Sequence, residues 1–295
     1  MLNDPLAQVI GLLRPAASMC KLVTASGQWA VRPPGEHPFY GAQLEGQCQL
    51  TIKGRGSITL QAGDFILIPN SHDFVITSLK PPSSGILDQP VELMPGEFHL
   101  GDPHRSDVRM LVGYCTFESP DAALLVSLLP DLVIARGEQR LATLVQLLRD
   151  EWRGQRPGRE VVLGHLLEVL LIEAFRSAAE SDVTPGLLRG LSDPRLAVAL
   201  RKMHAHPTTP WTINGLASEA GLSRSSFFDR FRREVGVAPM EYLLGWRMAL
   251  AKALLRRERL SMNEVAERVG YSSSSTFSVA FTRHVGQSPS AYARG

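Results

Sequence analysis

The chain has 295 residues, enough for two domains with separate cores, and its 44% apolar and 20% charged residues are typical of folded globular proteins. The longest apolar runs, such as residues 166–172, are too short to span a bilayer, and no basic cluster precedes an apolar core near the first residues, so we expect neither a membrane span nor a secretory signal. The formal net charge of +2 identifies no partner by itself.

The charge is unevenly distributed along the chain. Residues 1–192 carry 16 basic and 21 acidic side chains, a net charge of −5, whereas residues 193–295 carry 15 and 8, a net charge of +7. Asp193 and Pro194 mark this boundary, because aspartate caps helices and proline suits a first helical turn. A basic segment joined to an acidic one is expected where only one part meets nucleic-acid phosphates, although a solvated basic surface would give the same count.

The number and spacing of the cysteines indicate the redox environment of the protein and whether it has a cysteine metal site. Cys20, Cys48 and Cys115 are an odd number at wide spacings, which matches neither a disulfide framework nor a zinc motif. We therefore expect a protein of the reducing cytoplasm.

Residues 29–118 alternate between apolar and polar side chains, with turn residues every eight to twelve positions, which predicts a small antiparallel barrel or sandwich. Residues 48–53 and 57–61 flank a Gly-Arg-Gly turn and predict a hairpin. The run from Gly63 to Pro69 is similar to the second conserved box of cupin barrels, G-D-x-x-x-x-P, and residues 5–130 as a whole resemble a cupin-like sensor domain. We assign residues 1–135 to this domain and expect residues 81–104, rich in proline and glycine, to form a long loop.

The metal-binding pattern of cupins is broken in this sequence. Metal-binding cupins place several imidazoles on adjacent strands, whereas the first box here has a single His37, and Phe74 stands where a second-box histidine is common, with His72 displaced by two residues. We expect no metal, no cofactor and no cupin enzyme activity. The remaining function for the barrel is a small-molecule effector pocket, for which the candidate residues are Trp29, His37, Tyr40, Gln43 and His72.

Oxidation is an alternative trigger for the barrel domain. Cys20, which has Lys21 beside it, and Cys115 could sense oxidants if their thiolates were exposed in electropositive surroundings. Cysteines buried on strands are inert, and Cys48 fits that description because it alternates with apolar residues.

Residues 136–192 are expected to form a helical connector. Helical patterns cover residues 139–152 and 160–179, and the second carries more apolar side chains than one core-facing stripe needs. This helix is either buried between domains or pairs with its copy in a homodimer. Residues 177–190 then serve as the interdomain linker.

Residues 212–242 and 261–292 are two copies of one pattern. Each copy starts at a capping candidate, Thr212 or Ser261, and its first short helix ends at a glycine suited to a left-handed turn, Gly221 or Gly270. The second helix of each copy has apolar side chains four residues apart, so that one stripe packs inward and the other face is free: Phe227, Phe231 and Val235 in the first, Phe277, Phe281 and Val285 in the second. This is a helix-turn-helix pattern occurring twice.

In helix-turn-helix proteins, the second helix lies in the major groove of DNA. The free faces here offer Arg224, Ser225, Phe228, Asp229, Arg232, Arg233, Ser273, Ser274, Ser275, Ser278, Val279 and Arg283. Among them Arg224 is a candidate base-facing residue, and Arg232, Arg233, Ser273 and Arg283 are candidate phosphate contacts. Two simpler interpretations remain open: the serines may only cap the helix, and Asp229 may only pair with a neighbouring arginine. His204 and His206 are expected to be surface residues at the end of a helix.

Residues 193–295 closely resemble the DNA-binding domain of AraC/XylS-type transcription regulators, most clearly at residues 270–281 and 286–292. The resemblance implies an all-α domain with two recognition helices and, with the barrel, a multidomain α+β protein. It also implies that the base-facing positions are Ser225, Phe228, Asp229, Ser274, Ser275, Ser278 and Val279. It also implies a non-enzymatic regulator whose partners are double-stranded promoter DNA, a small-molecule effector, RNA polymerase and a second copy of the chain, with no membrane. The competing hypothesis is a cupin enzyme that carries a DNA-binding tail.

Overall fold

The structure is a computed structural model that describes residues 4–294 apart from short gaps at residues 36, 55, 70–72, 84–86, 120–121, 127–128, 179–184 and 258–259. The chain folds into two compact units. The barrel unit contains Arg14–Glu118 and Asp131–Asp182, and the helical unit contains Met1–Leu13, Ser119–Pro130 and Val183–Gly295.

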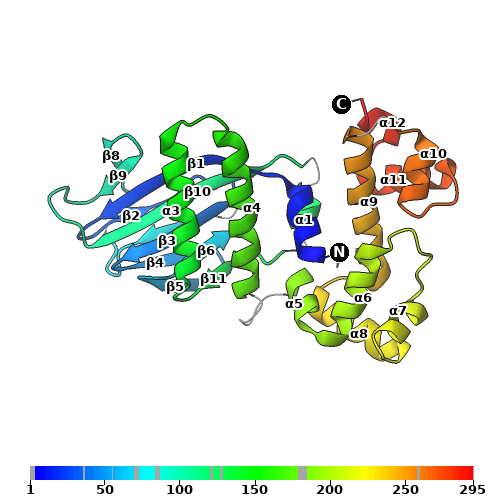
Figure 1. Cartoon of the computed structure of the whole chain (residues 1–295). Helices are drawn as coiled ribbons and strands as arrows, with labels where there is room; N and C mark the ends of the chain where they lie inside the picture. The colour runs from blue at the N-terminus through cyan, green and yellow to red at the C-terminus, as the bar shows by residue number, and fades with distance from the viewer. Residues whose placement is uncertain are drawn as a thin grey trace. The chain divides into compact units, whose positions relative to one another are not determined.

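Two β-sheets form the barrel unit (Figure 1). The seven-stranded sheet has the order β11-β6-β3-β10-β1-β9-β8, with bounds β1 Pro15–Ala25, β3 Phe39–Glu45, β6 Phe65–Ile68, β8 Val91–Met94, β9 Glu97–Leu100, β10 Val108–Phe117 and β11 Val133–Ala135. The four-stranded sheet has the order β2-β7-β4-β5, with bounds β2 Ala30–Val31, β4 Gln47–Ile52, β5 Gly56–Gln61 and β7 Phe74–Thr77. The described strand pairs are antiparallel except for β1 with β9, which is parallel. The predicted hairpin is confirmed as β4–β5.

Alternation along the strands sorts side chains between the barrel interior and the outer face of the large sheet. Strand β10 directs Val108, Met110, Val112 and Tyr114 into the interior core. The intervening residues face the other way, where helices α3 (Gln139–Gly154) and α4 (Arg159–Ala178) cover the sheet (Figure 1).

Helix α4 is the strongly apolar helix expected at residues 160–179. Its buried side chains pack within the barrel unit, against α3 and strands β1 and β11, and are Leu163, Leu167, Leu170, Leu171, Ala174 and Phe175. The covering of a wide sheet accounts for the surplus apolar surface, so neither an interdomain position nor a partner helix is needed to explain it.

Two parts of the strand prediction were wrong. Residues 81–104 do not form one long loop, because β8 and β9 pair within this segment across a turn at Gly96, whose φ is +75°. Strand β1 lies wholly before Trp29, where the alternating pattern was expected to begin. It lies between β10 and β9 in the large sheet, and its buried, half-buried and exposed residues do not alternate regularly along the strand.

The helical unit follows the predicted repeat. Its helices are α1 (Pro5–Leu13), α2 (Ala122–Val126), α5 (Leu187–Ser192), α6 (Pro194–Ala205), α7 (Ile213–Glu219), α8 (Arg224–Val235), α9 (Pro239–Arg257), α10 (Met262–Arg268), α11 (Ser274–Val285) and α12 (Pro289–Tyr292). The predicted caps are confirmed: Asp193, Thr212 and Ser261 accept backbone N–H groups of the first helical turns, and Ser261 with Glu264 forms a capping box.

The units divide the chain differently from the predicted boundaries. Helices α1 and α2, which directly precede β1 and follow β10 in sequence, belong to the helical unit, where α1 packs on α6 and α2 on α9. Residues 136–182 belong to the barrel unit rather than to a separate connector. The predicted linker also contains part of α5, which packs on α6 and α8.

His204 is not the surface residue that was expected. Its side chain is 2% exposed and stacks on Trp246, with ring centroids 4.0 Å apart. Its Nε2 lies 2.7 Å from the Tyr242 hydroxyl and its Nδ1 lies 2.9 Å from Oε1 of Gln8 on α1. Burial lowers the pKa of His204 to about 3, so the ring is neutral at physiological pH. His206, two residues later, is exposed as expected.

Among the described residues, no helix combines the length and apolar character that a membrane span requires, and no group of three or more His, Cys, Asp or Glu side chains could hold a metal ion.

Candidate nucleic-acid interface

Helix α8 has one buried and one exposed face. Phe227, Phe231 and Val235 are buried, and Phe231 meets Tyr242 edge to face at 5.8 Å. The exposed side chains at the start and on the opposite face are Arg224, Ser225, Asp229, Arg232 and Arg233, while Phe228 is half-buried. This placement agrees with the free face predicted for the first repeat.

Helix α11 repeats the arrangement. Phe277 and Phe281 are buried, with Tyr292 edge to face on Phe281 at 5.6 Å. Val279 is 71% exposed, Ser275 and Arg283 are exposed, and Ser273, Ser274 and Ser278 are half-buried. Thr276 and Thr282 are also exposed on this helix and were not among the predicted residues. Each lies three residues from Val279, and this helical spacing could have placed them on the same exposed face.

The serines at the two helix starts have a shared structural role. The Ser223 and Ser273 hydroxyls accept the backbone N–H groups of Ser226 and Thr276, respectively. The Ser273 Oγ lies 3.0 Å from the Oγ of Ser275. Ser273 therefore caps α11, and the Ser275 hydroxyl that contacts it lies exposed at the first turn of the helix.

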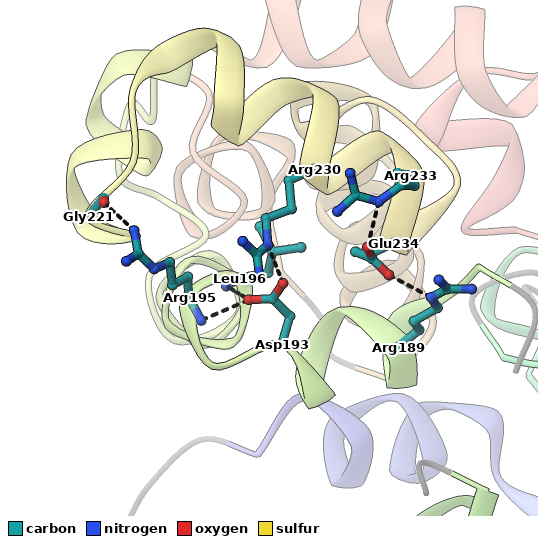
Figure 2. A network of polar contacts seen from close by, with 8 residues as sticks. All are labelled: Arg189, Asp193, Arg195, Leu196, Gly221, Arg230, Arg233 and Glu234. Atoms are coloured by element: carbon teal, nitrogen blue, oxygen red, sulfur yellow. Dashed lines mark hydrogen bonds and ion pairs between the residues drawn. The ribbon is translucent and has the colours of Figure 1, made fainter. Parts of the chain in front are cut away.

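A polar network holds α8 in place (Figure 2). Asp193, the cap of α6, forms an ion pair with Arg230 of α8, and Arg195 donates to the carbonyl of Gly221 in the turn between α7 and α8 at 2.8 Å. Partial burial raises the pKa of the Asp193 carboxyl, but hydrogen bonds from Arg230 and from the backbone of Leu196 and Arg195 outweigh it and hold the pKa below its usual value.

The arginines of α8 differ in their contacts with carboxylates of the protein. Glu234 accepts from Arg189 of α5 at 2.5 Å and from Arg233 at 2.7 Å, so both guanidinium groups contact a carboxylate of the protein itself (Figure 2). In the described part of the chain, Arg232 and Arg283 form no ion pair within 4.0 Å, and Asp229 does not pair with a neighbouring arginine. The simpler interpretation of Asp229 is therefore wrong.

The two helix-turn-helix repeats meet at a close backbone contact. Arg247 of α9 donates to the carbonyls of Pro207 and Thr209, at 2.7 and 2.8 Å, in the loop before α7. Gly270, at the end of α10, has φ +82°, and a Cβ built there would lie 2.8 Å from the Pro207 oxygen and 2.9 Å from the Thr208 Cα. This contact fixes the second repeat against the first.

The barrel contains a cavity of about 340 Å³, and one of the five predicted pocket residues, Trp29, lines it. His37 is exposed, Tyr40 and Gln43 are buried outside the lining, and His72 lies outside the described residues. Gln43 is held by Glu45 and Cys48 instead. Sequence reasoning missed the other lining residues, of which seven follow the alternation of β1 and β10: Lys21, Val23, Ala25, Val108, Met110, Val112 and Tyr114.

The cysteines do not meet the conditions for a thiolate sensor. Cys20 and Cys115 are both buried, and burial raises the pKa of each thiol to about 12, so neither forms a thiolate near neutral pH. Cys48 is buried in the barrel core between strands, as predicted.

The chain is similar to known proteins over both of its units. Residues 4–180 match the Cupin family and residues 216–295 match a helix-turn-helix domain family. An AraC-like transcription regulator of Streptomyces lividans is 32% identical, covering 98% of this chain and 97% of the relative. The chain belongs to the AraC-type transcription regulators.

Two further proteins are similar to this chain, one over its whole length and one over the helical part. The HTH-type transcriptional regulator AlkR of Acinetobacter baylyi is 28% identical over 98% of both chains. The crystal structure of the DNA-binding domain of AdpA, in complex with a target DNA, is 35% identical, covers 35% of this chain and 92% of that chain, and has a TM-score of 0.33. The predicted combination of a cupin barrel with an AraC-type helix-turn-helix domain is confirmed, and this AraC-type protein is a DNA-binding regulator.

Proposed function

We propose that α8 and α11 read promoter DNA in two successive major grooves, and that a small-molecule effector in the barrel cavity controls this binding and the contact with RNA polymerase in the cytoplasm. The observation that carries the proposal is the equivalence of the two helices: each buries two phenylalanines four residues apart and exposes the opposite face at the same repeat positions.

The length of α9 supports binding to two grooves. Its 19 residues, at roughly 1.5 Å each, span about 28 Å, close to the ~34 Å helical turn of duplex DNA. One chain can therefore read a site that has no two-fold symmetry.

The exposed residues suggest how affinity and specificity are divided. Arg232 and Arg283 are exposed cations without a protein ion pair among the described residues, so they fit phosphate binding. Ser275 is a permissive hydrogen-bonding residue, and Val279 can contact only a thymine methyl. We therefore expect appreciable readout of DNA shape alongside direct base contacts.

Arg232→Ala is expected to weaken binding to all duplexes alike, by roughly three- to tenfold, and to reduce the slope of log K against log salt by about 1, because one phosphate contact is lost. Fluorescence anisotropy on a selected site and on a scrambled duplex, at several salt concentrations, measures both quantities.

Arg233→Ala is the matched control, because the Arg233 guanidinium already contacts Glu234. It should change affinity and salt slope less than Arg232→Ala. Equal effects of the two variants would contradict the assignment of Arg232 as the main phosphate contact of α8.

Val279→Ala is expected to reduce the preference for thymine at one position of the site by roughly three- to fivefold, since an exposed valine can discriminate bases only through the thymine methyl. Selection from a randomised duplex pool followed by sequencing checks this. Val161→Ala, which shortens an exposed valine of the barrel unit, should leave the selected sequence unchanged. An unaltered profile for Val279→Ala would show that α11 does not read bases there.

Chain connectivity supports control from the barrel. Strands β1 and β10 line the cavity, and they continue directly into α1 and α2, which pack in the helical unit. An effector that favours one position of these strands over another can thereby bias the DNA-binding helices, as linkage requires.

A further inference from the structure

The barrel cavity is apolar apart from a few polar groups. Its volume of about 340 Å³ lies within the usual range for small-molecule sites. The exposed lining residues come from two short segments, residues 32–34 and 87–89, which therefore form its entrance. The deeper lining consists mainly of aliphatic and aromatic side chains, including Trp29, Phe39 and Ile76.

Most charges of the lining are already bound to protein groups. Arg32 pairs with Asp73 at 3.5 Å, and the Asp88 carboxylate accepts the backbone N–H of Ala30 at 2.8 Å. Lys21 on β1 differs from both. Its Nζ lies 4.7 Å from the centroid of the Phe98 ring and 6.0 Å from that of Tyr114, and it pairs with no carboxylate within 4.0 Å among the described residues.

The surroundings of Lys21 disfavour the charged form of its side chain. Lys21 is half-buried, and burial lowers the pKa of its ammonium group, with only a smaller opposing effect from Glu92. The two aromatic rings offset part of this cost, but a carboxylate would offset more, because a charge-assisted hydrogen bond is stronger than a contact with a ring face.

We propose that the cavity binds an organic monocarboxylate with an apolar body, whose carboxylate pairs with the Lys21 ammonium and whose body lies against Trp29, Phe39 and Ile76. This inference rests on the proposed effector function and specifies the ligand class.

The same features disfavour other ligand classes. A sugar or nucleotide would bury many hydroxyl or phosphate groups for which the apolar lining has no partners. A neutral hydrocarbon would fill the cavity and leave the ammonium desolvated without a counter-charge. An organic cation would be repelled by Lys21.

The test uses the full chain and two pairs of probes, octanoate with octanamide and 4-phenylbutyrate with 4-phenylbutyramide, in isothermal titration calorimetry. We expect the acids to bind the native protein about tenfold more tightly than their amides. Lys21→Met keeps the length of the side chain and removes the charge. It should weaken binding of the acids about tenfold and leave binding of the amides within about threefold.

Lys53→Met is the matched control, because Lys53 is an exposed lysine of the same barrel outside the cavity lining, and it should bind acids as the native protein does. Amide binding by Lys21→Met shows that the variant retains the cavity. Equal affinity of acids and amides for the native protein, or unchanged acid binding by Lys21→Met, would overturn the assignment.

A DNA-binding measurement separates this inference from the proposed function. If the acids fail to bind while the protein still binds its selected duplex, the ligand class is wrong and the DNA-binding proposal stands. If the acids bind through Lys21 but do not change the affinity for DNA by more than about twofold, the ligand class is right and the effector function is wrong.

Discussion

Gly270→Ala is expected to lower the free energy of unfolding of the helical unit by roughly 2–4 kcal/mol and to abolish high-affinity binding to the two-groove site. The backbone at Gly270 has φ +82°, a conformation that costs a residue with a Cβ about 1–2 kcal/mol, and the added Cβ would lie within 2.9 Å of backbone atoms of the loop before α7. Backbone cannot yield as a flexible side chain does. The second repeat must therefore shift relative to the first. The distance between α8 and α11 then no longer matches two successive major grooves.

Gly221→Ala is the matched control for this change. Gly221 occupies the same position in the first repeat, has φ +62°, and would meet nothing within 4 Å with a Cβ. It should carry only the conformational cost of about 1–2 kcal/mol. Thermal and urea denaturation of the two variants, together with anisotropy on single-groove and two-groove duplexes, check the prediction. Equal destabilisation by both would mean that the contact with residues 207–208 has no energetic weight.

The stability of the helical unit is expected to fall as the pH falls below 6.5, with a contribution from His204 of up to about 1.4 kcal/mol per pH unit. Burial lowers the pKa of His204 from its ordinary value of 6.5 to about 3 in the folded chain. Between these values the unfolded chain binds a proton that the folded chain does not. The stabilisation is therefore complete above pH 6.5 and is lost progressively toward pH 3, roughly 4–5 kcal/mol in total.

His204→Gln removes the titration and keeps a side chain able to form hydrogen bonds. This variant should be less stable than the native chain at pH 7, because stacking on Trp246 is lost, but its stability should fall less steeply between pH 6.5 and 4. His206→Gln changes an exposed histidine and should keep the native slope. Urea denaturation at half-unit steps of pH measures the slopes, and parallel slopes for the native chain and His204→Gln would contradict the assignment.

Local sequence signals predicted the helical unit well. Helix caps, glycine ends and a four-residue apolar spacing act within one or two turns, so the sequence around Ser261, Gly270 and Phe277 contains the information needed to place α10, the turn and α11. The duplication strengthened the prediction, because each motif occurs twice at the same positions.

The effector pocket was predicted less well for a physical reason. A cavity is formed by side chains from strands distant in sequence, here mainly β1 and β10, which pair along nearly their whole length. His37 and Tyr40 were predicted to line the pocket because their side chains carry polar groups. The position of a residue in the sheet, however, decides which face of the sheet its side chain occupies. Lys21 and Tyr114 face the cavity, whereas their neighbours Cys20 and Cys115 are buried outside its lining.

The sequence by itself determined the two-domain plan, the segregation of positive charge into residues 193–295, the two helix-turn-helix repeats and the exposed faces of their second helices, because these follow from local periodicity and capping. Only the tertiary structure decided that α1 and α2 pack with the DNA-binding helices, that His204 is buried and neutral, that Glu234 pairs with Arg189 of α5, and that Lys21 lines the cavity and pairs with no carboxylate among the described residues. These features depend on contacts between residues far apart in the chain, and no local pattern encodes such contacts.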